Sequence, residues 1–538
     1  MKSKVYVLAY DIGTTGTKTC LFEIGNRLTL VHSASQEYGL TLLEGGGVEQ
    51  DPQDWWNSMR DTTAQVLKES KLDPAEIRGI SFCSQMQGLV LVDKDLKPVR
   101  PAMSYMDQRA GEEMKKGIEH GIKIEGLNAY KLLRSLQITG AVAGSVKDPL
   151  WKYKWVEAKE AEKFARVHKW LDVKDYLTTR CTGRATMTLD SAFATFLYDS
   201  RPGKSRWHKG LCKMFGVRPE HLPDLIQSTD LIGGLTEISA KELGLKEGTA
   251  VFGGGGDATL IGIGAGAVEE GDTHIYAGTS GWVSTVTKKR TVDINARIAS
   301  IVGARAGYYN YFGEQETSGK CLQWVKDHLA LDEIDVYLEK KNVTEGEDAV
   351  HESLFAFLFE SIKDTPAGSD GVIFTPWLHG NRCPFEDPAA RGMFFNIGLD
   401  TGKRKLIRSV IEGISFHKRW ILELSQAKVP ASSTVRFVGG VARSPIICQI
   451  LADITGKTIE TIDHPQNAGA TGAAAIAALG LGKIHSFEEI KNLIPSKQRW
   501  IPNPANKPVY DRNFSVFKKL YEANKAHYAI LNTYNILP

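Results

Sequence analysis

A Gly/Thr-rich turn, Asp11-Ile12-Gly13-Thr14-Thr15-Gly16-Thr17-Lys18, follows the short apolar run Val5–Tyr10 near the start of the chain. Ala277-Gly278-Thr279-Ser280-Gly281 repeats this arrangement after the run Thr273–Tyr276. In both places the residues that follow the turn are rich in strand formers. Two copies are too few for a solenoid. The repeat therefore predicts two similar domains that face a shared ligand.

The rest of the chain alternates strand-like and helix-like segments, which predicts the α/β class. The glycine run Gly253–Gly256 lies between the two repeats and is the expected hinge. We therefore expect an N-terminal domain at residues 1–255 and a C-terminal domain at residues 256–538. Apolar residues at helical spacing between Phe514 and Tyr528 predict that the second domain ends in a helical extension.

The composition argues against several classes of protein. The chain of 538 residues has 66 basic and 63 acidic residues and a formal net charge of +3, which leaves no electrostatic footprint for nucleic acid or an anionic membrane. No apolar stretch of about 20 residues occurs, so no membrane span is expected. The 7 cysteines are scattered and none forms a CxxC pair, so we expect reduced thiols in a cytoplasmic protein.

The first turn has the residues of a phosphate site. Gly13 lets the backbone approach an anion, and Thr14 and Thr15 add hydroxyl donors. Lys18 adds a positive charge, and Asp11 at the strand end is suited to Mg²⁺. The P-loop pattern GxxxxGK[ST] is absent from this turn. Taken alone, the motif is equally compatible with an ordinary Gly-rich hairpin.

The second turn makes a nucleotide site the better interpretation. Gly278, Thr279 and Ser280 provide the same residue types, and two such turns can hold a phosphate tail from both sides. Tyr276 stands where the first copy has Asp11, so only one domain keeps the acidic residue. This asymmetry favours a single Mg–nucleotide between the domains.

Asp257 is the candidate catalytic base, because it directly follows the four glycines at the expected hinge. Phosphoryl transfer to an alcohol needs a group that accepts the hydroxyl proton. The alternative is a helix N-cap, which is common for Asp after glycines and is the better reading without further context. Farther along, Thr317-Ser318-Gly319-Lys320 resembles a phosphate loop only superficially, and we expect it to cap the helix that holds Trp324.

Several motifs occur in the order and approximate spacing of the FGGY carbohydrate kinases, which the chain resembles from about Val5 to Gly480. Within that family it is most similar to the xylulose kinases. Each motif is weak alone, but the ordered set is specific. Besides the two turns, the matching segments are Gln85–Gly88, Pro101–Arg109, Pro149–Val156, Gly253–Ala258, Ile407–Glu412 and Val438–Pro445.

The resemblance implies two actin-like (ribonuclease-H-like) ATPase domains around a central cleft. It assigns catalysis to Asp257 and sugar binding to Met86, Gln87, Asp107 and Asp257. With Asp11, Asp257 is also the expected metal ligand. The residues expected to bind ATP are Gly13, Thr14, Thr15, Lys18, Gly278, Thr279, Ser280, Gly439, Gly440, Arg443 and Ser444.

The implied activity is ATP- and Mg²⁺-dependent phosphorylation of a small sugar, with conversion of D-xylulose to D-xylulose 5-phosphate as the first choice. Gln87 stands where xylulose kinases commonly have His, and Tyr105 where they have Trp, so D-ribulose, L-xylulose and erythritol stay open. A non-transferring ATPase or sugar sensor of the same superfamily is the rival. The expected partners are the sugar and ATP, with no nucleic acid or membrane, and a homodimer is left open.

Overall fold

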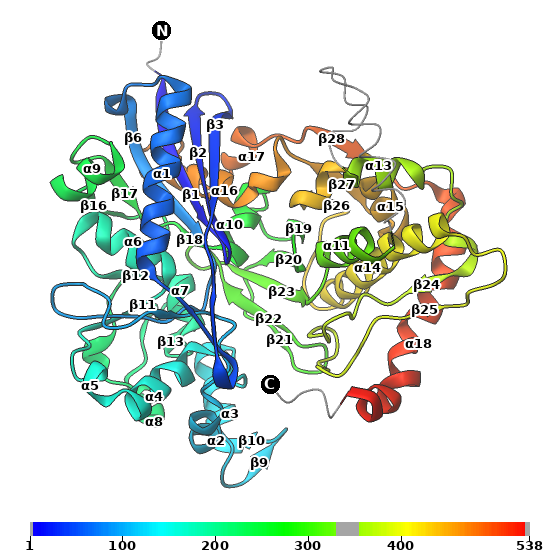
Figure 1. Ribbon diagram of the computed structural model, residues 1–538, viewed down its shortest axis with the longest axis horizontal. Coiled ribbons are helices and arrows are strands. Elements are labelled where there is room, and N and C mark those ends of the chain that lie inside the picture. Colours follow the sequence, from blue (N-terminus) through cyan, green and yellow to red (C-terminus); the bar gives the residue numbers. More distant parts are fainter. Residues whose placement is uncertain (1–3, 330–353, 533–538) are drawn as a thin grey trace.

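The computed structural model describes residues 4–329 and 354–532 and has one large β-sheet in each half of the chain (Figure 1). The strands of the first sheet are, in spatial order, β16 (Leu231–Gly234), β17 (Ala250–Phe252), β6 (Ile77–Ser84), β1 (Val5–Ile12), β2 (Gly16–Ile24) and β3 (Leu28–Glu37), with β18 (Gly255–Gly256) beside β6. Strands β1, β2 and β3 form an antiparallel meander, whereas β6 and β17 continue the sheet in parallel with β1. The first turn is the β1–β2 connection.

The second sheet repeats the first. Its strands are, in spatial order, β21 (Val292–Asp293), β22 (Ile298–Val302), β23 (Tyr309–Gln315), β20 (Gly281–Thr287), β19 (Thr273–Ala277), β26 (Thr434–Val438), β27 (Thr458–Thr461) and β28 (Gln498–Trp500). Strands β19, β20 and β23 form the antiparallel meander, and β26 and β27 continue it in parallel. The duplication that the two turns predicted is therefore confirmed by the order and direction of the strands.

Two helices lie between the sheets, α10 (Asp257–Gly264) and α16 (Ala468–Gly480) (Figure 1). Although α16 comes from the second half of the chain, it packs on β1 and β6 of the first sheet as well as on α10. Its small residues permit this close packing, because a Cβ added to Gly472 would lie 2.1 Å from the carbonyl oxygen of Leu260. This Ala/Gly-rich helix is therefore pressed closely against both α10 and the first sheet.

The other face of the first sheet is covered by α1 (Pro52–Ser70) and α6 (Val173–Thr182). Asp51 starts α1, because its carboxylate accepts from the backbone N–H of Gln53 and Pro52 occupies the first turn. Lys71 ends the helix in the left-handed conformation with φ of 54°. The buried Trp55 and Trp56 belong to the apolar cluster that fixes this helix to the sheet.

The first half also carries a smaller region that packs around buried Trp151, Tyr153 and Trp170. It includes β4 (Thr41–Leu43), β5 (Gly47–Gln50), β7 (Val90–Val92), β8 (Ala102–Met103), β11 (Lys169–Leu171), α2 (Gly111–Ile118), α3 (Ala129–Thr139), α4 (Pro149–Lys159), α7 (Leu189–Ala194) and α8 (Lys209–Phe215). Hydrogen bonds join this region to the second half. Tyr309 Oη donates to the Ser200 carbonyl at 2.7 Å, and Arg290 donates to the Ile138 carbonyl at 2.8 Å, to the Gln137 carbonyl at 2.7 Å and to Ser200 Oγ at 3.1 Å.

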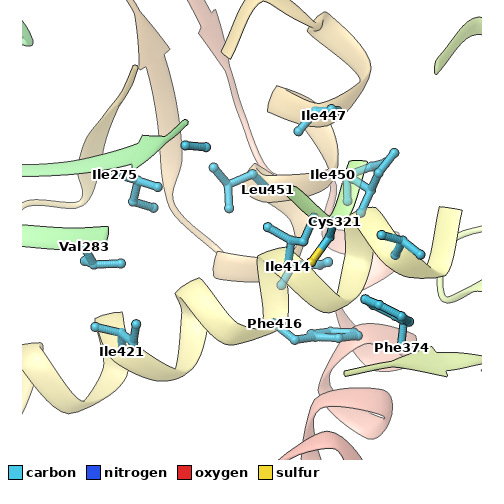
Figure 2. Packing of buried hydrophobic residues seen from close by; sticks show 14 of the residues in the cluster. Ile275, Val283, Cys321, Phe374, Ile414, Phe416, Ile421, Ile447, Ile450 and Leu451 are labelled. Atoms are coloured by element: carbon cyan, nitrogen blue, oxygen red, sulfur yellow. The ribbon is translucent and has the colours of Figure 1, made fainter. Parts of the chain in front are cut away.

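The second half has its own core, in which helices pack on the second sheet (Figure 2). The helices are α11 (Gly319–His328), α14 (Lys403–Gln426), α15 (Pro445–Thr455) and α18 (Lys507–Asn532). The apolar face of α15 is buried, and α18 confirms the predicted terminal helix. Ile414 and Phe416 of α14 contribute to the same core.

Within residues 4–329 and 354–532, no helix is long and apolar enough to cross a membrane. All of the cysteines are buried and free, as expected for reduced thiols.

Candidate active site

Hydrogen bonds to its backbone carbonyls fix the conformation of the first turn. The N–H of Gly13 donates to the carbonyl of Gly16 at 2.8 Å, which closes the turn. Tyr38 Oη donates to the carbonyl of Gly13 at 2.6 Å, and Gln50 Nε2 donates to that of Thr14 at 2.9 Å. Thr15, in contrast, is exposed. The Thr14–Thr15 edge therefore stays accessible to a ligand while the carbonyl side is fixed.

The second turn is closed in a similar way. The N–H of Gly278 donates to the carbonyl of Ser280 at 3.0 Å. The start of α11 anchors the turn, because the N–H of Gly319 donates to the carbonyl of Gly278 at 2.7 Å. Thr279 is exposed, like Thr15 in the first turn. A Cβ added to Gly278 would lie 2.2 Å from Tyr276 Oη, so this position is restricted to glycine.

The two repeats meet at their strand ends. Burial raises the pKa of Asp11, and the Lys18 ammonium, opposite it in the β1–β2 register, opposes that rise. Burial also raises the pKa of Tyr276, and the charges of Asp11 and Asp257 raise it further. The ring of Tyr276 stacks on Trp282 with centroids 4.1 Å apart. Asp11, Tyr276 and Asp257 are therefore close enough for their charges to interact.

Asp257 is the first residue of α10, and the N-cap is Gly256. The alternative that Asp257 is itself the N-cap is therefore wrong. Its Oδ1 accepts a hydrogen bond from the N–H of Ala258 at 2.7 Å. Burial raises the pKa of Asp257 to about 7, and the negative charges of Asp11 and Glu314 add to the rise. A carboxylate with a pKa near neutrality is well matched to accept a proton from a hydroxyl.

Asp190 fixes the start of α10, and the motifs did not identify it. This carboxylate is 2% exposed, and its Oδ2 accepts from the N–H of Gly256 at 2.7 Å and from Thr259 Oγ1 at 2.6 Å. On its other oxygen it accepts from Thr188, which in turn accepts from Lys174 Nζ at 2.6 Å. In the sequence, Asp190 looks like an ordinary acidic residue in a helix's first turn, so only the fold shows that it positions Asp257.

The turn that carries Met86 and Gln87 lies beside Asp257. A Cβ added to Gly256 would lie 2.2 Å from Met86 Sδ, which places Met86 against the peptide before the base. Gln87 has a φ of 64°, and its N–H donates to Asp172 Oδ2 at 3.0 Å. Lys152 Nζ donates to the carbonyl of Gln87 at 2.9 Å. Buried charges on both sides thus hold this turn in its left-handed conformation.

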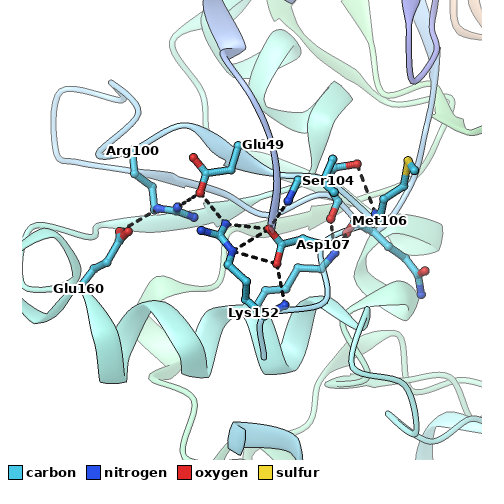
Figure 3. Close-up of polar contacts among 10 residues, drawn as sticks. Glu49, Arg100, Ser104, Met106, Asp107, Lys152 and Glu160 are labelled. Atoms are coloured by element: carbon cyan, nitrogen blue, oxygen red, sulfur yellow. Dashed lines mark hydrogen bonds and ion pairs between the residues drawn. The ribbon is translucent and has the colours of Figure 1, made fainter. Parts of the chain in front are cut away.

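The carboxylate of Asp107 is already engaged by hydrogen-bond partners within the protein (Figure 3). Its side chain is fully buried, and Oδ2 accepts from the N–H of Val48 at 2.9 Å and from Arg109 Nη2 at 2.7 Å. Arg109 also pairs with Glu49 and stacks over the ring of Trp155, 4.4 Å from its centroid. The structure therefore joins Asp107 to Arg109, and direct contact of either residue with a sugar stays a prediction.

The remaining predicted ATP residues fall into two groups. Lys18 Nζ donates to the Gln466 carbonyl at 3.1 Å and to Asn467 Oδ1 at 3.0 Å, so it ties the first turn to the segment before α16. Ser444 caps α15, because its Oγ accepts from the N–H of Ile447 at 3.4 Å. Gly440 and Arg443, next to this cap, are exposed. Their contact with a nucleotide stays a prediction.

The acidic pair Asp11 and Asp257 fits a Mg²⁺ that is held mainly by phosphates. Among the described residues, no group of three or more His, Cys, Asp or Glu side chains could hold a metal ion. Mg²⁺ in nucleotide sites usually takes one or two carboxylates and completes its shell with phosphate oxygens and water. The negative charge of Asp11 raises the pKa of Asp257, and a cation between the two carboxylates would relieve this effect.

Family models match both halves of the chain. The model of the N-terminal domain of the FGGY family of carbohydrate kinases matches residues 6–264, and that of the C-terminal domain matches residues 274–481. The chain belongs to the FGGY family of carbohydrate kinases. It is therefore a sugar phosphotransferase with ATP as a substrate, and the predicted pair of actin-like domains is confirmed.

Relatives with two different names are about equally similar to this chain. Xylulose kinase of Bacillus subtilis (strain 168) is 27% identical over 97% of both chains. Gluconokinase of the same strain is 26% identical over 98% of both chains. The crystal structure of ligand-bound xylulose kinase from Lactobacillus acidophilus matches with a TM-score of 0.83 at 25% identity and covers 98% of this chain and 99% of that one.

Proposed function

We propose that this FGGY kinase phosphorylates D-xylulose to D-xylulose 5-phosphate. The supporting observation is the negative charge around the base, since Asp11, Glu314 and Asp172 each raise the pKa of Asp257. Arg382, the cation beside Glu314, is already paired with Glu314 at 2.9 Å and with Glu316. A neutral ketose enters such surroundings at less electrostatic cost than gluconate, whose carboxylate adds a charge. The xylulose kinase relatives support the same choice, with another pentulose or a polyol as the alternative.

In the proposed reaction, Asp257 accepts the proton of the sugar hydroxyl as its oxygen attacks the γ-phosphorus of ATP, and ADP leaves. The Gly13–Thr15 and Gly278–Ser280 turns hold the phosphate chain with backbone N–H groups. Mg²⁺, held by Asp11 together with the phosphates, would neutralise charge on the transferred group. The turn at Met86 and Gln87 orients the sugar next to Asp257. We expect these steps to occur in the cytoplasm.

A panel of acceptors tests the choice of sugar. ADP release should be measured with D-xylulose, D-ribulose, L-xylulose, erythritol and D-gluconate at fixed MgATP. We expect the highest kcat/KM with D-xylulose, and a value for gluconate lower by about 100-fold or more, since one unfavourable buried charge costs several kcal/mol. A higher kcat/KM with gluconate would overturn the proposal, and ADP release that no sugar stimulates would favour the ATPase or sensor.

The base assignment also predicts the pH dependence of kcat/KM. Because only the carboxylate form of Asp257 can accept the proton, activity should rise with pH and level off above the pKa of about 7. Asp11→Asn removes a negative charge that raises this pKa, so the acid limb should move to lower pH even if the maximum falls. The measurement is the pH profile of kcat/KM for both proteins. An acid limb that stays in place or moves upward would contradict the coupling.

A further inference from the structure

A buried lysine lies directly behind the second turn. Lys418 is in the middle of α14 and is 1% exposed. Its Nζ donates to the carbonyl of Tyr276 at 3.1 Å, at the peptide that leads into the turn. A Cβ added to Gly281 would lie 2.6 Å from this Nζ, so the glycine that ends the turn leaves the space that the ammonium fills. One side chain thus contacts both ends of the turn.

The surroundings of Lys418 contain polar groups but no countercharge. Among the described residues it has no ion pair, and Cys321 of α11 is the titratable group that influences it. Ser318, at the N-cap position of α11, is fully buried and its Oγ has no hydrogen-bond partner, so the expected side-chain cap is not made. Gln315 of β23 lies opposite Gly281 in the sheet, is fully buried, and also lacks side-chain partners.

The described parts of the other elements around Lys418 contribute no charged group to its surroundings. Strands β19 and β20 contribute the Tyr276 carbonyl and Gly281. Lys418 also lines a cavity whose other walls, from β19, β26, α11, α14 and α15, are apolar apart from Ser415. Burial lowers the pKa of Lys418 to about 7 because the ammonium is far from water. A negative ligand on the turn would supply the countercharge that residues 4–329 and 354–532 do not provide.

We propose that Lys418 is a positioning residue for ATP: it clamps the second turn through the Tyr276 carbonyl and supplies a positive charge behind the nucleotide phosphates. Binding of the phosphates favours the ammonium form, so nucleotide binding takes up a proton. The proton comes from solvent and is released when the nucleotide leaves. The inference rests on the proposed nucleotide role of the Gly278–Ser280 turn.

Lys418→Met tests this inference, because Met fills the same space without the charge or the donor. We expect the KM for ATP to rise about tenfold or more, because the variant loses both the hydrogen bond to the Tyr276 carbonyl behind the nucleotide turn and the positive charge. The KM for the sugar should stay within about twofold, because the sugar turn loses no contact. Calorimetry of ADP binding between pH 7 and 9, in buffers of different ionisation enthalpy, should detect proton uptake in the native protein that is lost in the variant.

Two further variants make the result specific. Lys405→Met removes a half-buried, ion-paired lysine from the start of the same helix and should leave both KM values unchanged. Lys418→Gln keeps a donor without the charge, so it should also lose proton uptake. Native proton uptake and a native KM for ATP in Lys418→Met would overturn the inference.

The role of the turn itself is tested separately. Gly278→Ala inserts a Cβ 2.2 Å from Tyr276 Oη and should weaken ATP binding if the turn holds phosphates. If Gly278→Ala leaves the KM for ATP unchanged, the proposed nucleotide site is wrong. If only Lys418→Met leaves it unchanged, the inference about Lys418 alone is wrong.

Discussion

Replacing Asp257 by Asn is expected to lower kcat by about 10²–10⁴-fold, the usual contribution of a general base. Asn has nearly the same shape and can still accept from the N–H of Ala258 at the start of α10. It cannot accept the proton of the sugar hydroxyl, so only the chemical step loses its acceptor. The measurement is steady-state ADP release with saturating sugar and ATP.

Nucleotide binding provides the control for that experiment. The Kd for ADP should stay within about threefold of the native value, because the two turns hold the phosphates through backbone groups outside Asp257. Asp224→Asn, an exposed carboxylate far along the chain from the turns, should leave kcat unchanged. A near-native kcat for Asp257→Asn would show that another group, or the phosphate itself, takes the proton.

The features predicted correctly from the sequence are those that lie within short stretches of the chain. Each turn and its two flanking strands lie within one short stretch, Val5–Ile24 in the first half and Thr273–Thr287 in the second. Alternation of apolar runs with Gly and Thr is enough to indicate them. The same local pattern placed Asp257 next to a glycine run and identified Tyr276 as the counterpart of Asp11. The order of the remaining motifs then pointed to the family, which the domain matches confirm.

The features that the sequence did not predict depend on contacts between distant residues. Asp190 is 66 positions from the Gly256 N–H that it fixes, and Lys418 is 142 positions from the Tyr276 carbonyl. Neither residue belongs to a distinctive sequence motif, because Asp190 lies in the first turn of the short helix α7 and Lys418 lies inside the long helix α14. Asp107 was found by resemblance, but its burial depends on the N–H of Val48, 59 positions away. Pairings of this kind are determined by packing, not by local pattern.

The crossing of α10 and α16 is the place where a small change should have a large effect on stability. α16 belongs to the second half of the chain but packs on the first sheet, so this crossing joins the two halves. The helices approach through glycines on both sides. A Cβ added to Gly264 would lie 1.8 Å from the carbonyl oxygen of Ala468, and one added to Gly472 would lie 2.1 Å from that of Leu260.

Gly472→Ala is therefore expected to lower the free energy of unfolding by about 2 kcal/mol or more, the upper range of overpacking costs. Two effects of this substitution on stability oppose each other. Overlap with the Leu260 carbonyl oxygen destabilises the protein, whereas Ala inside a helix is favoured over Gly by about 1 kcal/mol. The overlap prevails because the contacted atom belongs to the backbone of α10 and cannot rotate away as a side chain could. Denaturant unfolding measures the change, with Gly402→Ala, where an added Cβ meets nothing within 4 Å, as the control. A stabilised Gly472→Ala protein would mean that the helices separate freely, so that α16 does not rigidly join the two halves.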